Sequence, residues 1–284
     1  MSIVVTGATG HLGRHVVEQL LDKVPADQVT AVVRDRAKAA DLAARGVRIA
    51  VADYNAPETF DGLFAAGDKV LLISGNEVDK GRVQQHKVVI DAAKAAGVAL
   101  LAYTSAPGSL TAALADDHRA TEEVLLASGL PYALLRNGWY HENYTENLAP
   151  VLAHDAVVAA AGEGRVSSAS RADYAAAAVA VLTGEGHENR TYELGGDESW
   201  GFAEYAAELS ARTGKEIAYN NVPGDVLKDI LAGAGLPAPF AELLVGVDAS
   251  IAKGELVVSS GDLSRLAGRP TTPFSEAIAA ALKD

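Results

Sequence analysis

The sequence contains no cysteine among its 284 residues. Disulfide bonds, catalysis by a thiolate and cysteine-ligated metal sites are therefore excluded. Basic residues are also scarce, because 24 Lys and Arg stand against 37 Asp and Glu, for a net charge of −13. Nucleic-acid binding requires clusters of Lys and Arg that neutralise phosphates, so we expect no nucleic-acid partner. We interpret the acidity as a solvated surface.

Long apolar runs are missing too. No stretch reaches the roughly 18 apolar residues that suggest a membrane-spanning helix, and no basic region precedes an apolar stretch at the N-terminus. We therefore expect neither a membrane span nor a secretory signal, and a cytoplasmic location. His86, His141 and His154 are too scattered for a metal-ligand motif, so we predict no metal site.

A dinucleotide signature is present at the N-terminus. Residues 3–5 form a short, mostly β-branched run that is typical of a buried strand. Gly7, Gly10 and Gly13 follow, and from His11 onward apolar residues recur at helical spacing. Glycines let a phosphate approach the backbone, the N–H groups at a helix start bind anions, and Gly13 would let the helix pack closely on its strand. The order of strand, glycine turn and helix therefore predicts a dinucleotide site, with an ordinary turn as the alternative.

The second apolar run, residues 29–33, ends in Arg34-Asp35-Arg36. An acidic residue at this point binds the ribose 2′-hydroxyl of NAD, whereas a basic residue accommodates the 2′-phosphate of NADP. Arg34 occupies the place of the acid, so we predict NADPH over NADH, favoured by a charge-assisted hydrogen bond of about 1.5–3 kcal/mol. We interpret Asp35 as the N-cap of a helix over residues 36–45. The alternative is that both arginines are merely solvated.

Strands and helices alternate through the first half of the chain, which predicts a doubly wound parallel sheet. The expected strands are residues 3–5, 29–33, 47–51, 69–74, 98–104 and 131–136. The expected helices are the one that begins at His11 and those over residues 36–45, 55–65, 83–96 and 116–128, the last with Asp116 as its cap. We therefore predict an NAD(P)-binding Rossmann domain over residues 1–137.

After Asn137 the pattern loosens and prolines accumulate. We expect helices over residues 142–153, 172–182, 203–213, 226–234 and 275–282, and short strands over residues 157–159, 191–194 and 216–219. We interpret residues 138–284 as a smaller C-terminal α+β domain that covers the cofactor and shapes the substrate pocket, with some segments returning to the Rossmann core.

The tyrosine and lysine that short-chain dehydrogenases carry four residues apart on the helix after the fifth strand are missing. In those enzymes the lysine lowers the pKa of the tyrosine, which exchanges a proton with an alcohol. Here His118 and Glu122 share one face of the helix predicted over residues 116–128. His118 is therefore a candidate proton donor, with Glu122 fixing its tautomer. The alternative is a partly exposed histidine paired with a carboxylate.

Hydride transfer to an easily reduced acceptor needs mainly the juxtaposition of donor and acceptor, without such a proton relay. Residues 137–144, Asn-Gly-Trp-Tyr-His-Glu-Asn-Tyr, are dense in aromatic and polar groups just beyond the sixth strand. We interpret them as the lining of a flat aromatic pocket, with Tyr140 as a second catalytic candidate. A packing hinge between domains is the alternative.

Several segments together resemble the NmrA-like atypical short-chain dehydrogenases. They are Val-Thr-Gly-Ala-Thr-Gly-His-Leu-Gly at 5–13, Val-Val-Arg at 32–34, Leu-Ile-Ser at 72–74, Ala-Tyr-Thr-Ser at 102–105, Leu-Arg-Asn-Gly-Trp-Tyr at 135–140 and Ser-Arg-Ala-Asp-Tyr-Ala at 170–175. The pattern is most similar to the NAD(P)H:quinone oxidoreductase type 2 members, with triphenylmethane reductase as a near relative, and it covers nearly the whole chain.

The resemblance implies the residues of a cofactor site. The first turn would hold the pyrophosphate, Arg34 would meet the 2′-phosphate, and residues 74–76 would run along the ribose and nicotinamide side. The implied cofactor-binding residues are Gly7, Ala8, Thr9, Gly10, His11, Leu12, Arg34, Ser74, Gly75, Asn76, Thr104, Asn137, Gly138, Trp139, Tyr140, His141, Glu142 and Arg171. At residues 75–76 the quinone reductases tend to carry serines, whereas the Ser-Gly turn found here is more like the dye reductase.

The resemblance thus implies an NADPH-dependent reductase that transfers hydride to a quinone, with water or His118 supplying the proton. One alternative is a dinucleotide-binding redox sensor without turnover, and another is a reductase of a different aromatic acceptor such as a triphenylmethane dye. A third is a nucleotide-sugar epimerase or dehydratase, against which the missing tyrosine–lysine pair argues. The physiological acceptor and the oligomeric state stay open, with a homodimer as one expectation.

Overall fold

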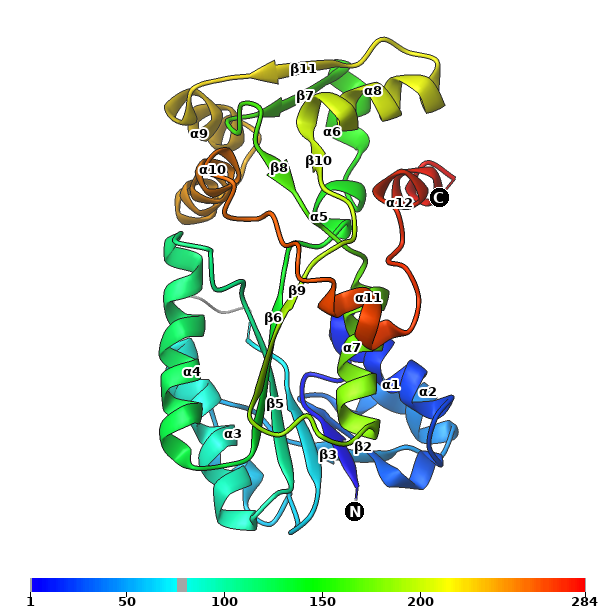
Figure 1. Ribbon diagram of the computed structural model, residues 1–284, viewed down its shortest axis with the longest axis vertical. Coiled ribbons are helices and arrows are strands. Elements are labelled where there is room, and N and C mark those ends of the chain that lie inside the picture. Colours follow the sequence, from blue (N-terminus) through cyan, green and yellow to red (C-terminus); the bar gives the residue numbers. More distant parts are fainter. Residues whose placement is uncertain (1, 76–80, 284) are drawn as a thin grey trace.

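A parallel sheet forms the core of the computed structural model, which describes residues 2–75 and 81–283 (Figure 1). Within these ranges the main sheet has seven strands in the order β3-β2-β1-β4-β5-β6-β9, and every pairing is parallel. The bounds are β1 Ile3–Val5, β2 Val29–Val33, β3 Arg48–Val51, β4 Lys69–Leu72, β5 Leu100–Ser105, β6 Tyr132–Asn137 and β9 Arg190–Leu194. The strand order reverses between β1 and β4, and in such sheets ligands bind beyond the carboxyl ends of the strands at this point.

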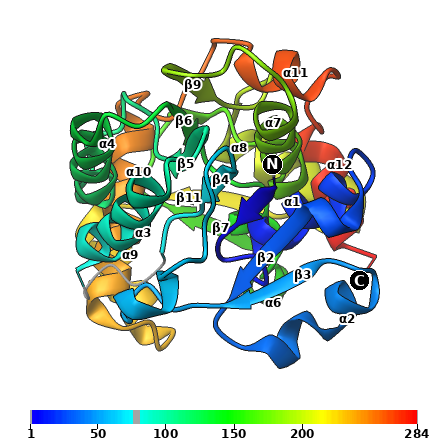
Figure 2. The ribbon, with the colours of Figure 1, turned by 90° about the horizontal axis from the view of Figure 1, so that it is seen from below.

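Helices cover both faces of the main sheet (Figures 1 and 2). On one face α1 (His11–Leu21), α7 (Arg171–Thr183) and α11 (Asp262–Ala267) pack together. On the other face α3 (Arg82–Ala96) and α4 (Asp116–Ser128) lie side by side, while the short α2 (Ala40–Ala44) connects β2 to β3. The predicted doubly wound Rossmann-like fold is confirmed.

The central strands of the main sheet are apolar along most of their length, as expected where helices cover both faces of a sheet. Every residue of β1, β4 and β5 is buried. Val16, Val17 and Leu20 of α1 belong to the core on one side of the sheet. Val89 and Ile90 of α3 belong to the core on the other side. The sheet therefore separates two apolar layers, and its carboxyl edge is left for polar groups.

A second region lies beyond that carboxyl edge, in the upper half of Figure 1. Its helices are α5 (Glu142–Thr145), α6 (Ala149–His154), α8 (Phe202–Thr213), α9 (Gly224–Gly233), α10 (Ala238–Ala252) and α12 (Phe274–Ala281). Strand β7 (Ala156–Ala159) pairs in parallel with β11 (Ala218–Asn221), and β8 (Arg165–Val166) pairs antiparallel with β10 (Trp200–Gly201). A separate core forms here around Trp200, which stacks on Phe274 with 4.0 Å between the ring centroids.

The chain crosses between the two regions more than once. After β6 it enters the second region, and it returns to the main sheet at α7 and β9. It comes back once more at α11, which packs on α7. The boundary between residues 137 and 138 stays a prediction.

Some predicted elements are wrong. The helix expected over residues 55–65 is only a 3₁₀ turn at Pro57–Phe60, and Gly62 follows it with a left-handed φ of 68°. The helix expected over residues 142–153 is broken into α5 and α6, because Pro150 in the first turn of α6 has no N–H to continue the preceding helix. Asp116 is the first residue of α4 and not its cap, since the cap is Ala115.

Other elements were not expected from the sequence, namely α10, α11, β8 and β10. Pro237 and Pro239 indicate a loop, yet α10 begins there with a proline in its first turn. A proline at that position costs no hydrogen bond, because the first N–H groups of a helix have no partner inside it. The two short strands contain only two residues each, too few to show a periodic pattern.

Candidate active site

The turn after β1 lies tightly against the start of α1. Gly7 adopts a left-handed φ of 62°, and its carbonyl oxygen accepts a hydrogen bond from the Gly10 N–H at 2.9 Å. The Ala8 N–H donates to the Val32 carbonyl at 3.2 Å, which ties the turn to β2. A methyl group on Gly13 would lie 2.2 Å from the Gly7 oxygen. The predicted strand–turn–helix unit is confirmed, and Gly13 has the close-packing role predicted for it.

The start of α1 has the chemistry of an anion site. The first N–H groups of a helix have no acceptor within the helix. The N-cap of α1 is Gly10, which has no side chain to cap them. The helix dipole adds positive potential at this end. The loop of residues 7–12 therefore suits the pyrophosphate that the resemblance implies.

Arg34 and Arg36, the two arginines that follow β2, lie in different surroundings. Asp35 caps the following 3₁₀ turn by accepting a hydrogen bond from the Ala37 N–H at 2.9 Å, so its predicted capping role is confirmed. This turn and α2 replace the single helix expected over residues 36–45. The Arg36 guanidinium donates to the Ile49 carbonyl of β3 at 2.8 Å. Arg34 is exposed at the end of β2, where a 2′-phosphate is expected.

Ser74 and Gly75 leave β4 at the reversal point of the sheet. The Ser74 N–H donates to Thr104 Oγ1 on β5 at 2.9 Å. The Gly75 N–H donates to His86 Nε2 on α3, also at 2.9 Å. The three implied contact residues Ser74, Gly75 and Thr104 are therefore neighbours. Asn76 lies outside the described residues.

Tyr54 reaches the same edge from the loop after β3 and was not predicted. Its hydroxyl bonds to Thr6 Oγ1 and donates to the Ile73 carbonyl at 2.9 Å, so it bridges the ends of β1 and β4. Burial raises the pKa of Tyr54, while the Thr6 hydrogen bond and the nearby charge of Arg34 act in the opposite direction. The only signal in the sequence was a tyrosine shortly after the third strand, which does not distinguish a site residue from a core residue.

Side chains from beyond β6 gather opposite the glycine turn. The Arg171 guanidinium lies over the Tyr140 ring, 5.3 Å from its centroid, and pairs with the Glu146 carboxylate. Glu146 Oε1 lies 3.7 Å from His11 Nδ1 at the start of α1. Glu142 Oε1 accepts a hydrogen bond from the Arg171 N–H at 2.8 Å. The fold thus brings together the predicted residues His11, Tyr140, Glu142 and Arg171.

Two buried oxygens in this group have no hydrogen-bond partner among the described residues, namely Asn137 Oδ1 and Glu142 Oε2. A buried acceptor without a donor is costly, and such groups are rare in folded proteins. A dinucleotide carries amide and hydroxyl donors of the kind that these oxygens require. Together with the glycine turn, they show that the residues present fit a dinucleotide.

The neighbouring residues of the 137–144 segment bond within the protein. The Gly138 N–H donates to the Leu194 carbonyl at 2.7 Å, and the Trp139 ring packs in the core of the second region. His141 is buried, with Nδ1 2.8 Å from Ser168 Oγ and Nε2 2.9 Å from the Thr272 carbonyl. These contacts match the packing hinge given as the alternative for this segment, and a cofactor role for Gly138, Trp139 and His141 stays a prediction.

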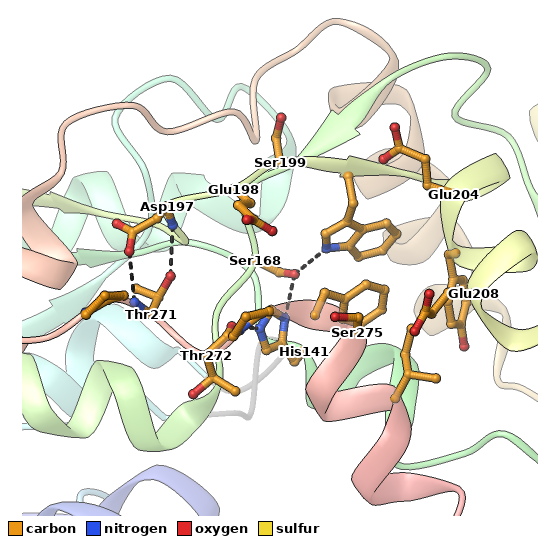
Figure 3. A pocket seen from close by; sticks show the side chains of 16 residues that line it. His141, Ser168, Asp197, Glu198, Ser199, Glu204, Glu208, Thr271, Thr272 and Ser275 are labelled. Carbon is orange, nitrogen blue, oxygen red and sulfur yellow. Dashed lines mark hydrogen bonds between the residues drawn. The ribbon is translucent and has the colours of Figure 1, made fainter. Parts of the chain in front are cut away.

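A cavity of about 280 Å³ lies beside His141 (Figure 3). Trp200 Nε1 donates to Ser168 Oγ at 2.7 Å on its wall. Thr271 and Asp197, side by side on one wall, exchange two hydrogen bonds of 2.8 and 2.9 Å (Figure 3). Of the predicted site residues that the structure describes, only His141 lines this cavity. It lies between the segment that leads into α12 and the start of α8, and several of its polar groups bond to one another.

The predicted pair of His118 and Glu122 is wrong. His118 Nδ1 lies 2.9 Å from the Tyr103 hydroxyl in the layer between the sheet and α4. Glu122 instead accepts hydrogen bonds of 3.0 and 2.7 Å from Arg136 on β6. His118 is buried, which also contradicts the exposed alternative, and burial and the charge of Arg82 lower its pKa to about 3. Its role as a proton donor stays a prediction, and its neutral, enclosed ring favours a structural role.

Within the part of the chain that the structure describes, no group of three or more His, Asp or Glu side chains is placed to hold a metal ion. In the same ranges, every helix is too short or too polar to cross a membrane.

Comparison with known proteins decides the family. A family model described as NAD(P)H-binding matches residues 7–185. The chain belongs to this NAD(P)H-binding family. The matched part contains the glycine turn and the strands from β2 to β6.

Known proteins are also similar to this chain over nearly its whole length. The chain is 45% identical to quinone oxidoreductase 2 of Escherichia coli (strain K12), over 97% of each protein. The crystal structure of the NADPH-dependent quinone oxidoreductase from E. coli complexed with NADPH aligns over 99% of each chain, with a TM-score of 0.95 and 44% identity. The triphenylmethane reductase of Citrobacter sp. aligns over all of each chain, with a TM-score of 0.94 and 41% identity. The resemblance identified from the motifs is confirmed.

Proposed function

We propose that the protein is an NADPH-dependent reductase that transfers a hydride to a quinone. The observation that carries the proposal is the likeness, over 99% of both chains, to a quinone oxidoreductase whose crystal structure contains NADPH. The glycine turn, the position of Arg34 and the two unpartnered oxygens support the same cofactor from this chain's own residues.

The residues at the carboxyl edge would hold the dinucleotide in distinct ways. The N–H groups at the start of α1 would bind its pyrophosphate. The Arg34 guanidinium would bind the 2′-phosphate as a charge-assisted pair. Asn137 Oδ1 and Glu142 Oε2 would accept hydrogen bonds from its amide or hydroxyl groups. Tyr140, held between Arg171 and Tyr174, would form one wall of the cleft.

When bound, the dinucleotide supplies the hydride. Its addition to a quinone leaves a hydroquinone anion that needs one proton. Burial raises the pKa of Tyr140, which disfavours its ionisation, and His118 is buried with its Nδ1 atom bonded to the Tyr103 hydroxyl. We therefore assign the proton to water, with the side chains acting by orienting the two reactants.

Cofactor oxidation by the purified protein tests the proposal. NADPH and benzoquinone are mixed with the protein, the loss of nicotinamide absorbance is followed, and NADH is used in parallel. The proposal predicts oxidation that depends on the quinone and is faster with NADPH. Tight NADPH binding without turnover on a quinone or a cationic dye would contradict it and would indicate a redox sensor.

A cationic triphenylmethane dye is the second acceptor class. The likeness to triphenylmethane reductase and the Ser74-Gly75 turn favour it. The same assay with such a dye compares the two acceptors directly. A cytoplasmic location and a homodimer stay predictions, and light scattering during gel filtration tests the latter.

A further inference from the structure

We infer that His86 is a positioning residue, because its Nε2 atom holds the backbone amide of Gly75 where the chain leaves β4. The inference deepens the proposed function and rests on it in one respect, since Gly75 meets the cofactor only if this turn is the cofactor loop. His86 is fully buried on α3 and would act on the cofactor only through Gly75.

The hydrogen bonds around His86 define its tautomer. The Gly75 N–H can only donate, so Nε2 must be unprotonated to accept this bond of 2.9 Å. Nδ1 then carries the proton and lies 2.9 Å from Thr121 Oγ1. The Thr121 hydroxyl donates its own hydrogen to the Asp117 carbonyl at 2.7 Å, so it is available to His86 only as an acceptor. The hydrogen bonds on both sides of the imidazole therefore require the same tautomer, with the proton on Nδ1.

The turn after β4 is held at two consecutive amides by two different elements. Thr104 on β5 accepts the hydrogen bond from Ser74, and His86 on α3 accepts the one from Gly75. Gly75 also lies close against α3, because a methyl group there would be 3.2 Å from Gln85 Oε1. The direction in which the chain leaves the sheet is thus set by side chains that lie beneath the site.

The surroundings keep the imidazole neutral. Burial and then the charge of Arg82 lower the pKa of His86 to about 3. Arg82 Nε lies 3.2 Å from the Asp117 carboxylate of α4, so this charge is itself held in place. The rings of Tyr103 and Tyr54 pack edge-on against the imidazole. His86 consequently remains an acceptor toward Gly75 throughout the neutral pH range.

A matched pair of substitutions tests this role. In His86→Gln the side-chain amide oxygen can take the place of Nε2, whereas the side chain in His86→Asn is too short to reach Gly75. We expect His86→Asn to weaken NADPH binding about three- to tenfold, the range of a single neutral hydrogen bond, and His86→Gln to stay within about twofold of the parent protein. The KM for benzoquinone should not change in either variant.

Tyr103→Phe is the control for general damage to the same buried cluster. It removes a hydroxyl that lies 2.9 Å from His118 Nδ1 and 3.5 Å from His86 Nδ1. It leaves both the 2.9 Å bond from Gly75 to His86 Nε2 and the 2.9 Å contact between His86 Nδ1 and Thr121 in place. Urea unfolding and fluorescence titration with NADPH are measured on all three variants. We expect Tyr103→Phe to lower the stability while the Kd for NADPH stays the same. An equal Kd for His86→Asn and the parent protein, with only the stability lowered, would overturn the inference.

A measurement on the unsubstituted protein covers the case in which His86→Asn fails to fold. Nitrogen-15 spectra of labelled histidine report which ring nitrogen carries the proton. We expect the Nδ1–H tautomer for His86, and the Nε2–H tautomer would overturn the inference. Because neither this spectrum nor the Kd for NADPH depends on a quinone, failure to reduce quinones would refute the proposed acceptor and leave the role of His86 to be decided separately.

Discussion

A methyl group on Gly13 would lie 2.2 Å from the carbonyl oxygen of Gly7. The first turn of α1 therefore lies directly against the backbone of the turn that precedes it. This contact fixes where the N–H groups at the start of the helix lie relative to the end of β1. The anion site that we propose depends on that placement, because the attraction of a helix terminus falls off within a single turn.

Gly13→Ala should disrupt both the fold of this turn and cofactor binding. Its new methyl group overlaps backbone atoms, so we expect a loss of about 1–3 kcal/mol in the free energy of unfolding and a weaker affinity for NADPH. Urea unfolding and fluorescence titration measure the two effects. Gly246→Ala in α10 is the control, because nothing lies within 4 Å of the added methyl group and alanine favours a helix. Similar behaviour of the two variants would contradict the close-packing role.

Arg34→Glu should weaken NADPH binding far more than NADH binding. The loss of a charge-assisted hydrogen bond of about 1.5–3 kcal/mol predicts a roughly ten- to hundredfold rise in the Kd for NADPH. NADH lacks the 2′-phosphate and should lose little affinity. Arg45→Glu makes the same charge change at the end of α2 and should affect the two cofactors equally. An equal loss for both cofactors in Arg34→Glu would contradict the 2′-phosphate assignment.

Arg136 joins three elements, because it bonds Glu122 of α4 at 2.7 Å and Glu193 of β9 at 2.8 Å. Arg136→Met leaves the Glu122 carboxylate buried without its cation, so we expect the free energy of unfolding to fall by about 3 kcal/mol. The double variant Arg136→Met with Glu122→Leu removes both charges. Its free energy of unfolding should fall clearly less than that of Arg136→Met alone. Urea unfolding compares them, and an equal loss in both would show that the buried charge is not the cause.

Asp248 of α10 should make stability depend on pH. Its carboxylate accepts a hydrogen bond from the Ala160 N–H at 2.7 Å, and burial raises its pKa from 3.8 to about 6. Between these values the folded protein binds a proton that the unfolded chain has lost, so this group lowers stability as pH rises through the window. Asp248→Asn should therefore raise the free energy of unfolding by about 1–2 kcal/mol near neutral pH and by almost nothing at about pH 4. A gain of the same size at both pH values would contradict the pKa shift.

The first half of the fold was predictable because its elements carry local signals. β1 is a continuous apolar run, β4 is apolar after Lys69, β5 is apolar up to Thr104, and all three strands are completely buried in the sheet. Gly97 and Gly129 end the two helices on one face with left-handed φ values of 68° and 76°. α10 was missed because two prolines at its start are also typical of loops, and only its packing shows that it is a helix.

The residues that gather at the carboxyl edge of the sheet were largely predictable, but the hydrogen-bond partners of the side chains next to it were not. Spacing places His118 and Glu122 on one face of α4, as expected. Which group Glu122 faces depends on Arg136, which comes from the next strand and bonds both of its oxygens. In the same way, no local pattern indicates that His86 lies under Gly75. Such pairings depend on how the helices pack on the sheet, and a single sequence does not show this.

Direct hydride transfer is the central claim, and a kinetic isotope effect tests it most directly. NADPH that carries deuterium at either the pro-R or the pro-S position of the nicotinamide C4 is mixed with the protein, and a single turnover with benzoquinone is followed by absorbance. The proposal predicts slower oxidation for one of the two deuterated forms and formation of one hydroquinone for each NADPH consumed. Unchanged rates with both forms, or no oxidation after NADPH has bound, would contradict it.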